Sequence, residues 1–167
     1  MWNKIVEHLG GHPERLAVAR VIVENGLTVK NHGIYCNEIE IPSTSIARVA
    51  KVDRRTVSHT VKSIEENSEL DMIFKHLRSA GYSLRDIARY LEFGVVEITV
   101  DDAKRPGILA SAAQLLAEKQ IGIRQAIVDD PELSPEPKLT LVAETSLPGD
   151  VVPKLLKIEG VKKVSIY

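Results

Sequence analysis

The sequence predicts an α+β chain, with an all-α N-terminal half at residues 1–93 and a C-terminal half at residues 94–167 that has the element order βαββαβ. Two observations predict this class. Apolar residues recur at helical spacing through much of the first half, whereas Val96, Ile98 and Val100 alternate with polar residues as in a half-buried strand. Two helical segments then alternate with strand-like segments, an order typical of a four-stranded sheet with both helices on one face.

The composition is that of a globular protein. A chain of 167 residues with 44% hydrophobic residues can form two small domains with their own cores. The single cysteine, Cys36, cannot form an intramolecular disulfide, which suits a reducing cytosol. Because the sequence has neither a signal-peptide pattern nor an apolar run of the roughly 20 residues that a membrane span needs, we expect a cytoplasmic protein without membrane contact.

Two helices are expected at the start of the chain. The apolar face of the first is formed by Trp2, Ile5, Val6 and Leu9. The second begins near Pro13 and ends near Asn25, because Pro suits the first helical turn and Gly26 suits the position after the last. Residues 28–41 contain a turn signal but only a broken alternation, so no strand is assigned there.

Residues 45–64 predict two short helices joined by a turn. Six residues form the inward faces of this pair: Ile46, Ala47 and Ala50 on the first helix, and Val57, Val61 and Ile64 on the second. Asp53 is expected to cap the second helix by accepting a hydrogen bond from the amide of Thr56 or its neighbour. Residues 42–64 hold five basic residues and one acidic residue, a local net charge of +4 in a chain of net charge −1, so contact with nucleic acid is expected here.

Ile46-Ala47, Val52 and Thr56-Val57 give this stretch a pattern that resembles the helix-turn-helix of bacterial and archaeal transcription regulators. Lys51 stands where the motif usually has Gly, which predicts either a different turn or a Lys in a left-handed conformation. The residues expected to contact duplex DNA are Arg48, Lys51, Arg54, Arg55, Thr56, Ser58, His59 and Lys62. The alternative is that these side chains are the solvated face of a three-helix domain.

Two further helices complete the first half. One carries Leu70, Ile73, Phe74 and Leu77 at helical spacing. The other begins at Ser83, after the break at Gly81, and is expected to connect the two halves while packing through Ile87 and Leu91.

Five elements are expected after the first strand of the second half. Helices are predicted at residues 108–119 and 148–157, and strands at residues 121–127, 138–145 and 161–166. Residues 129–137, with three prolines, form a long polar tip between the two middle strands.

The loop after the first strand has the chemistry of a site for an amino acid. Gly107 lets a ligand approach the backbone, and the amides of Ile108 and Leu109 are unpaired at a helix start, where a carboxylate binds. Asp101 or Asp102 is placed to hold an ammonium group. The alternative is that this loop is only a tight strand-to-helix turn in a domain that dimerises.

Asp102, Pro106-Gly107-Ile108-Leu109 and Ile121-Gly122-Ile123 are spaced as in the ACT family, which residues 95–167 closely resemble. The resemblance implies a ferredoxin-like fold that senses small molecules, commonly amino acids, at an interface between paired domains. Together with the helix-turn-helix, it is similar to predicted archaeal regulators of amino-acid metabolism. The expected ligand-binding residues are Asp101, Asp102, Arg105, Pro106, Gly107, Ile108, Leu109 and Arg124. Arg124 stands where amino-acid-binding members often have Asn or Asp, and it favours a ligand with a second negative group.

We therefore expect a transcription regulator that binds duplex DNA and responds to a small effector, an amino acid or another carboxylate, without a cofactor. A homodimer is expected because the four-stranded sheet has free edges, and because two helices in one layer leave its opposite, apolar face incompletely covered. The alternative is a regulatory or assembly module that dimerises through the C-terminal domain and does not bind DNA.

Enzyme function is not expected. The sequence has no phosphate-binding loop, no Gly-x-Ser-x-Gly and no paired cysteine motif. His32 and Cys36 could supply two metal ligands, but a structural site needs four. Neither a catalytic residue nor a metal site is therefore predicted.

Overall fold

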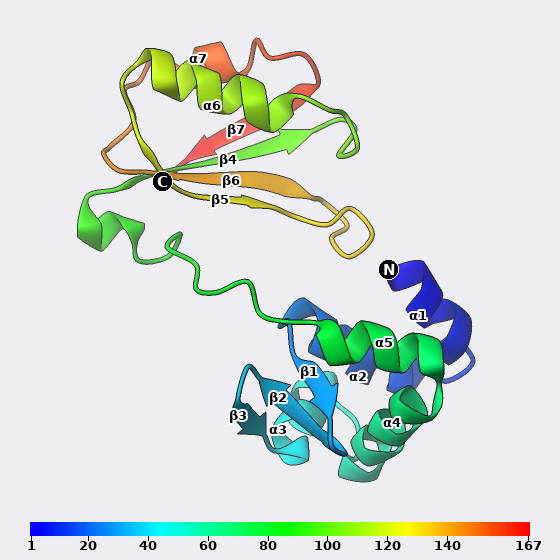
Figure 1. Cartoon of the computed structure of the whole chain (residues 1–167). Coiled ribbons are helices and arrows are strands. Elements are labelled where there is room, and N and C mark those ends of the chain that lie inside the picture. Colours follow the sequence, from blue (N-terminus) through cyan, green and yellow to red (C-terminus); the bar gives the residue numbers. More distant parts are fainter. The chain divides into compact units, whose positions relative to one another are not determined.

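The computed structural model describes the whole chain, Met1–Tyr167, which divides into two compact units, Met1–Gly81 and Tyr82–Tyr167 (Figure 1). The division lies before the change of period seen in the sequence after residue 93, because residues 82–91 pack on the sheet of the second unit. None of the helices combines the length and the apolar character that crossing a membrane requires.

The first unit contains five helices and a small sheet. Its helices are α1 (Trp2–Leu9), α2 (Pro13–Glu24), α3 (Ser43–Ala50), α4 (Arg54–Glu66) and α5 (Ser68–His76). Its strands, β1 (Thr28–Lys30), β2 (Gly33–Cys36) and β3 (Ile39–Ile41), pair antiparallel in the order β1-β2-β3. The expectation of an all-α N-terminal domain is therefore wrong.

The small sheet escaped prediction because its strands are three or four residues long, too short for a period to show. Its turns hold non-glycine residues in the left-handed region, with φ angles of 51° at Asn31, 60° at His32 and 55° at Asn37. Val29 and Ile34 are opposite each other in the sheet, and each is only 1% exposed. The sheet therefore contributes to the core of this unit.

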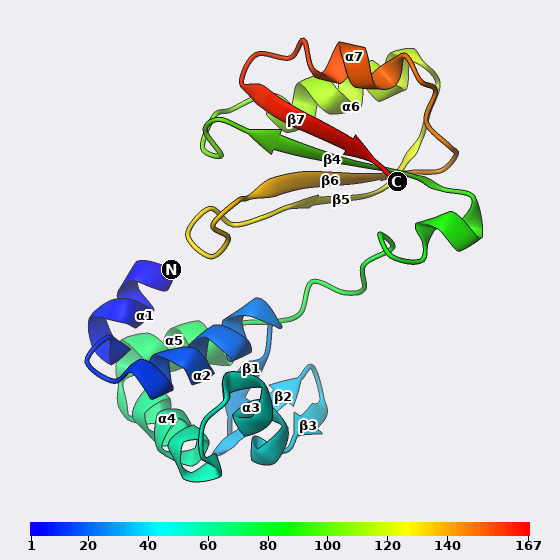
Figure 2. The ribbon, with the colours of Figure 1, turned by 180° about the vertical axis from the view of Figure 1, so that it is seen from behind.

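Helices α2, α3 and α4 contact one another, and α5 packs on α4 and β1 (Figure 2). Fully buried side chains fill this arrangement: Ile22 from α2, Ile34 from β2, Ile64 from α4, and Leu70 and Phe74 from α5. Burying each such side chain stabilises the fold by about 1.5–3 kcal/mol. The core thus holds α4 with one face inward and the other face in solvent.

The second unit is a four-stranded antiparallel sheet with two helices on one face (Figures 1 and 2). Its elements in chain order are β4 (Gly94–Val100), α6 (Ile108–Glu118), β5 (Ile123–Val128), β6 (Lys138–Ala143), α7 (Val151–Leu155) and β7 (Val161–Ile166). The strand order β5-β6-β4-β7 puts β6 between the two strands that α6 connects. The expected βαββαβ order therefore folds as a split βαβ sheet.

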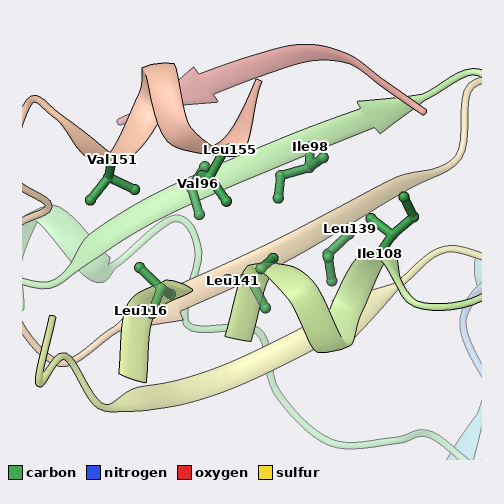
Figure 3. Packing of buried hydrophobic residues seen from close by; sticks show 9 residues of the cluster. Val96, Ile98, Ile108, Leu116, Leu139, Leu141, Val151 and Leu155 are labelled. Atoms are coloured by element: carbon green, nitrogen blue, oxygen red, sulfur yellow. The ribbon is translucent and has the colours of Figure 1, made fainter. Parts of the chain in front are cut away.

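The side chains between this sheet and its helices form the main core of the unit (Figure 3). The cluster contains Val96 and Ile98 from β4, Leu139 and Leu141 from β6, Ile108, Ala112 and Leu116 from α6, and Val151 and Leu155 from α7. Alternate residues of β4 and β6 contribute, as the period read from the sequence of β4 indicates.

The opposite face of the sheet is not the uncovered apolar surface that the sequence led us to expect. Glu97 and Thr140 lie on this face, because they alternate with the core residues of β4 and β6, and they are 6% and 8% exposed. Besides these two polar residues the face carries the apolar Val95 and Val142, and all four are already buried within the chain. An uncovered apolar sheet face therefore gives no reason for a dimer.

Residues 82–91 cover part of this face. Leu84 and Ala88 pack on Val95 and Val142, and Phe93 lies against the same cluster. The helix expected to begin at Ser83 is wrong, since only Ala88–Leu91 is helical, as the four-residue 3₁₀ helix η1. The apolar residues Leu84 and Ala88 have helical spacing, but they contact the sheet at two separate points and do not form one helix face.

Candidate DNA-contact surface and ligand cavity

The turn between α3 and α4 is tight and uses a left-handed residue. Lys51 has φ 57° and ψ 43°, and the amide of Val52 donates a hydrogen bond of 3.0 Å to the carbonyl of Ala47. A non-glycine residue in this conformation costs roughly 1–2 kcal/mol. The turn therefore keeps the usual geometry with Lys in the position where Gly is more common.

Asp53 caps α4, as the sequence predicts. Its Oδ1 accepts a hydrogen bond of 2.7 Å from the amide of Arg55, the neighbour of Thr56, and its backbone is extended. A side-chain cap of this kind stabilises a helix by about 1 kcal/mol. It also fixes the direction in which α4 begins after the α3–α4 connection.

Most of the residues expected to contact DNA lie on the solvent face of this motif. Exposed side chains are those of Arg48, Lys51, Arg54, Arg55, Ser58, His59 and Lys62. Arg55, His59 and Lys62 are spaced four and three residues apart, so they form one stripe along α4. Val57, Val61 and Ile64 on the opposite side are buried and hold the stripe outward.

Three of the expected contact residues already have partners within the chain. The hydroxyl of Ser58 donates a hydrogen bond of 3.4 Å to the carbonyl of Arg54. The hydroxyl of Thr56 donates a hydrogen bond of 3.1 Å to Oε2 of Glu14, and Thr56 is only half-exposed. Nζ of Lys62 lies 3.6 Å from Oε1 of Glu66. Arg54, Arg55 and His59 make no side-chain hydrogen bond or ion pair, so these groups are available to a ligand.

Residues that precede the motif in the sequence also lie beside α4. His12, Glu14 and Arg15 line a hollow with Thr56 and His59. On the sheet side, the amide and Nδ1 of His32 are 2.8 and 2.6 Å from the two carboxylate oxygens of Glu65. Sequence reasoning missed His32 because it assigned no strands at residues 28–41. It missed His12, Glu14 and Arg15 because local spacing does not show that α2 packs on α4.

A cavity of about 140 Å³ lies in the second unit between the β4–α6 loop and the end of the β5–β6 hairpin. Its lining is mainly apolar and includes three charged residues, Arg105, Asp129 and Lys138. The other lining residues are Val100, Ala103, Gly107, Ile108, Leu109, Val128, Pro137 and Leu139. Ligand sites in proteins typically combine such an apolar lining with a few polar groups. Four of the expected ligand-binding residues, Arg105, Gly107, Ile108 and Leu109, are brought together here.

Gly107 lies before α6 with φ 94°, and its carbonyl accepts the hydrogen bond of 2.9 Å from the amide of Ser111. The amides of Ile108 and Leu109 in the first turn have no partner within the helix. A methyl group built on Gly107 would meet no atom within 4 Å, so the space above this backbone is open. These features favour an anion at the start of α6.

The acidic residues of the loop are used to fold it. Oδ1 of Asp101 accepts a hydrogen bond of 2.7 Å from the amide of Asp102, and Oδ1 of Asp102 accepts one of 2.9 Å from the amide of Lys104. Asp101, Asp102 and Pro106 do not line the cavity. The structure therefore does not place an acidic pair where it would hold an ammonium group in this cavity.

Arg105 brings a cation to the cavity but already has an acidic partner. Its Nη1 is 2.9 Å from Oε1 of Glu159, and its Nε is 4.0 Å from Oδ1 of Asp101. The hydrogen bond to Glu159, together with the charge of Asp101, raises the pKa of Arg105 above its usual value. A carboxylate ligand at Arg105 would have to share this guanidinium with Glu159.

Arg124 lies at the other end of the sheet. β5 pairs Val128 with Leu139 beside the cavity, whereas Ile123, next to Arg124, pairs with Ala143 at the far end. The guanidinium of Arg124 lies 5.3 Å from the ring centre of Phe93. Within one chain, Asp129 and Lys138 line the cavity and Arg124 does not.

No group of three or more His, Cys, Asp or Glu side chains in the chain is arranged to hold a metal ion. His32, one of the two residues considered as ligands, is bonded to Glu65.

No protein-family model matches the chain, and the comparison with curated proteins gives no match. Among solved structures, the leucine response regulatory protein LrpA of Mycobacterium tuberculosis is 17% identical, with 93% of this chain and 90% of that chain covered and a TM-score of 0.29. E. coli AsnC is 10% identical, with 93% of this chain and 88% of that chain covered and a TM-score of 0.26. Scores of this size do not establish a shared fold, so the function is inferred below from the residues of this chain.

Proposed function

We propose that the chain is a transcription regulator that binds duplex DNA through α4 and senses a small carboxylate in the cavity of its second unit. The observation that carries the proposal is the set of exposed, unpaired basic side chains at the start of α4, led by Arg54 and Arg55. Basic side chains that are held outward by a buried core and have no acidic partner are suited to bind phosphate or base edges.

DNA would be contacted by the first turns of α4. In helix-turn-helix proteins the second helix enters the major groove, where Arg donates two hydrogen bonds to guanine. Arg54, Arg55 and His59 are the candidates for base contact. Arg48, Lys51 and Lys62 are the candidates for phosphate contact, with Lys62 exchanging its Glu66 partner for a phosphate.

Binding of the full chain to a duplex from its own upstream region, measured by fluorescence anisotropy across a salt series, tests this proposal. Since each phosphate contact releases counterions, log Kd should change linearly with log salt, with a slope near 0.9 per contact. A chain that binds no duplex even at low salt would refute DNA binding. It would leave the regulatory or assembly module as the better description.

The cavity supports sensing of a small ligand with one apolar part and one carboxylate. Its volume of about 140 Å³ suits a molecule of amino-acid size, and Val100, Val128 and Leu139 offer an apolar wall. The start of α6 and Arg105 line the same cavity. The helix dipole alone adds about 0.3–1 kcal/mol for an anion, so enclosure by the wall must contribute as well.

Thermal unfolding of the protein with each of the common amino acids and a set of short mono- and dicarboxylates tests sensing. A ligand that binds only the folded state raises the unfolding temperature in a concentration-dependent way. Dicarboxylates would stabilise more than monocarboxylates if Arg124 of a second subunit completes the site. If none of these compounds changes the unfolding temperature at millimolar concentration, the cavity does not bind this class of ligand.

The proposal includes a homodimer, because two copies of α4 are needed to contact two half-sites. Strand β5 is an edge of the sheet, and Ala126 and Val128 on it are exposed. Free edge strands of this kind pair readily with a second chain. Sedimentation at micromolar concentration measures the state, and a monomer there would contradict the dimer.

A further inference from the structure

Residues 82–91, which we call the strap, lie against the face of the second sheet that the helices leave open. The strap follows the connection between the two units, since α5 ends at His76 and the second unit begins at Tyr82. If strap residues detach from the sheet, they therefore become part of the connection between the units.

The strap has few apolar contacts for its length. Leu84 and Ala88 are buried, but Tyr82 and Tyr90 are 77% and 70% exposed, and Ile87 and Leu91 are also largely exposed. Its only regular element is the four-residue η1. A segment with two buried anchors and otherwise exposed residues belongs to the low-stability end of a protein, where local opening is frequent.

Two polar contacts attach the strap to the sheet. The first is made by Gln125 of β5, whose Oε1 accepts a hydrogen bond of 2.8 Å from the amide of Leu84. Its Nε2 donates a bond of 2.6 Å to the carbonyl of Tyr82. One side-chain amide thus fixes the strap backbone at two points.

The second contact is an ion pair with a buried partner. Nε of Arg85 on the strap is 2.5 Å from Oε1 of Glu97 on β4, and the side chain of Glu97 is only 7% exposed. The hydroxyl of Tyr167 donates a hydrogen bond of 3.2 Å to Oε2 of Glu97, and Nζ of Lys138 lies 3.7 Å from the same oxygen. Glu97 is held in place by the sheet, so Arg85 binds a fixed acceptor.

We propose that the strap is a releasable attachment that sets how much free chain connects the two units, with Gln125 and Glu97 as its positioning residues. When the strap is attached, the connection is only a few residues long, because Leu77 and Arg78 are still hydrogen-bonded to Thr28 of the first unit and the second unit begins at Tyr82. When it is released, residues 82–91 join the connection and extend its reach by on the order of 35 Å, since an extended residue spans about 3.3–3.6 Å. This goes beyond DNA binding and sensing, because it concerns the range over which the first unit can move from the second.

Hydrogen exchange of the full chain, without DNA or effector, tests the proposal. Glu97→Gln removes the charge that Arg85 binds but keeps the shape of the side chain, and Gln125→Ala removes the two backbone contacts. Each variant should speed exchange of the strap amides, Leu84 included, by at least about tenfold, because a lost hydrogen-bonded anchor raises local opening. Exchange in α6 and β6 should stay as in the wild type.

Asp86→Asn is the matched control. Asp86 is the other acidic partner of Arg85, at 2.9 Å from its Nη1, but its side chain is 83% exposed. Because an exposed pair contributes little, this variant should leave strap exchange unchanged. Equal exchange of the strap in the wild type, Glu97→Gln and Gln125→Ala would overturn the proposal, as would an equal effect of Asp86→Asn.

Energy transfer between dyes at Cys36 and at Lys157→Cys reports the free length directly, since the two positions lie in different units. The distance distribution should broaden in Glu97→Gln and in Gln125→Ala, and not in Asp86→Asn. A distribution unchanged in both strap variants, despite fast strap exchange, would refute the role in connection length. Because no DNA or ligand is present, these outcomes are independent of the proposed regulatory function.

Discussion

The two candidate sites each lie at the start of a helix that follows a residue with positive φ, but they are built from different groups. At α4 the turn residue is Lys51, and the site consists of side chains on the outside of one helix. At α6 the residue is Gly107, and the site is a cavity with one wall from the β4–α6 loop and the start of α6 and the other wall from the β5–β6 hairpin. A surface of side chains depends on one short stretch of sequence, whereas a cavity depends on two distant stretches.

The largest effect is expected at α4, where the proposed site depends only on exposed side chains. Replacing Arg54 and Arg55 together with Ala should weaken binding to the upstream duplex by about 2–4 kcal/mol, roughly 30- to 1,000-fold, because each base contact contributes about 1–3 kcal/mol. The free energy of unfolding should change by less than about 0.5 kcal/mol, since both side chains are exposed and unpaired. Anisotropy titrations and urea unfolding measure the two quantities.

Lys75→Ala combined with Lys157→Ala is the control, because it removes the same charge from exposed positions off the α4 surface. If this control weakens DNA binding as much as the Arg54 and Arg55 double variant, only net charge matters. α4 would then have no special role in binding.

Ligand binding in the cavity should depend on the wall formed by the β5–β6 hairpin, which is distant in sequence from the start of α6. The α4 surface has no such second wall. Val128→Trp, on exposed edge strand β5, fills the cavity and places no new demand on the backbone. For an effector present at 100 times its Kd, the variant should lose most of the stabilisation of about 2.7 kcal/mol that the wild type gains. Ligand-dependent thermal unfolding measures it.

Ile123→Trp is the matched control, since it enlarges an exposed residue on the same strand outside the cavity. Stabilisation by the effector should survive in this variant. Loss of stabilisation in both variants would point to a general effect on β5, and loss in neither would place the ligand elsewhere.

The contrast also explains what could be predicted from the sequence. The cap by Asp53 and the inward stripe of Val57, Val61 and Ile64 follow from local spacing, and the structure has them as expected. The order of strands and helices in the second unit follows from periodicity in the same way. Local rules suffice where the partners are a few residues apart.

What could not be predicted depends on distant partners or on very short elements. Asp129 and Lys138 reach the cavity through the hairpin register, which no local pattern reveals. Arg124 was assigned to the site from the resemblance, and the strand direction carries it to the other end of the sheet. The three strands at residues 28–41 were missed because none is longer than two periods.

A smaller effect, on the free energy of unfolding, is expected from substituting the turn residues Gly107 and Lys51. Gly107→Ala should destabilise the second unit by about 1–2 kcal/mol, because φ 94° is unfavourable for any residue with a side chain, although the space there is open. Lys51→Gly should stabilise the first unit by at most about 1 kcal/mol, since the gain at φ 57° is partly offset by the greater freedom of Gly in the unfolded chain.

Chemical unfolding of the two variants measures these changes. Changes of opposite sign in the free energy of unfolding would confirm that α4 and α6 each follow a residue with positive φ, a conformation that favours Gly. Destabilisation by Lys51→Gly would instead mean that the Lys side chain contributes more to the fold than its conformation costs.

The last expected effect is that of pH on the attachment of the strap through Glu97, which is absent near neutral pH and appears only in acid. Burial raises the pKa of this carboxyl, but the hydrogen bond and charge of Arg85, with Lys138 and Tyr167, outweigh burial and lower the pKa below the usual 4.5. A carboxyl with a lowered pKa stabilises the attached strap fully above its usual pKa, and this contribution is lost as the pH falls through the lowered value. Exchange of the strap amides, corrected for intrinsic rates, should therefore be constant from about pH 8 to about pH 5 and should rise only below the usual Glu pKa. Loosening of the strap between about pH 8 and about pH 6 would show that a histidine, and not Glu97, controls its attachment.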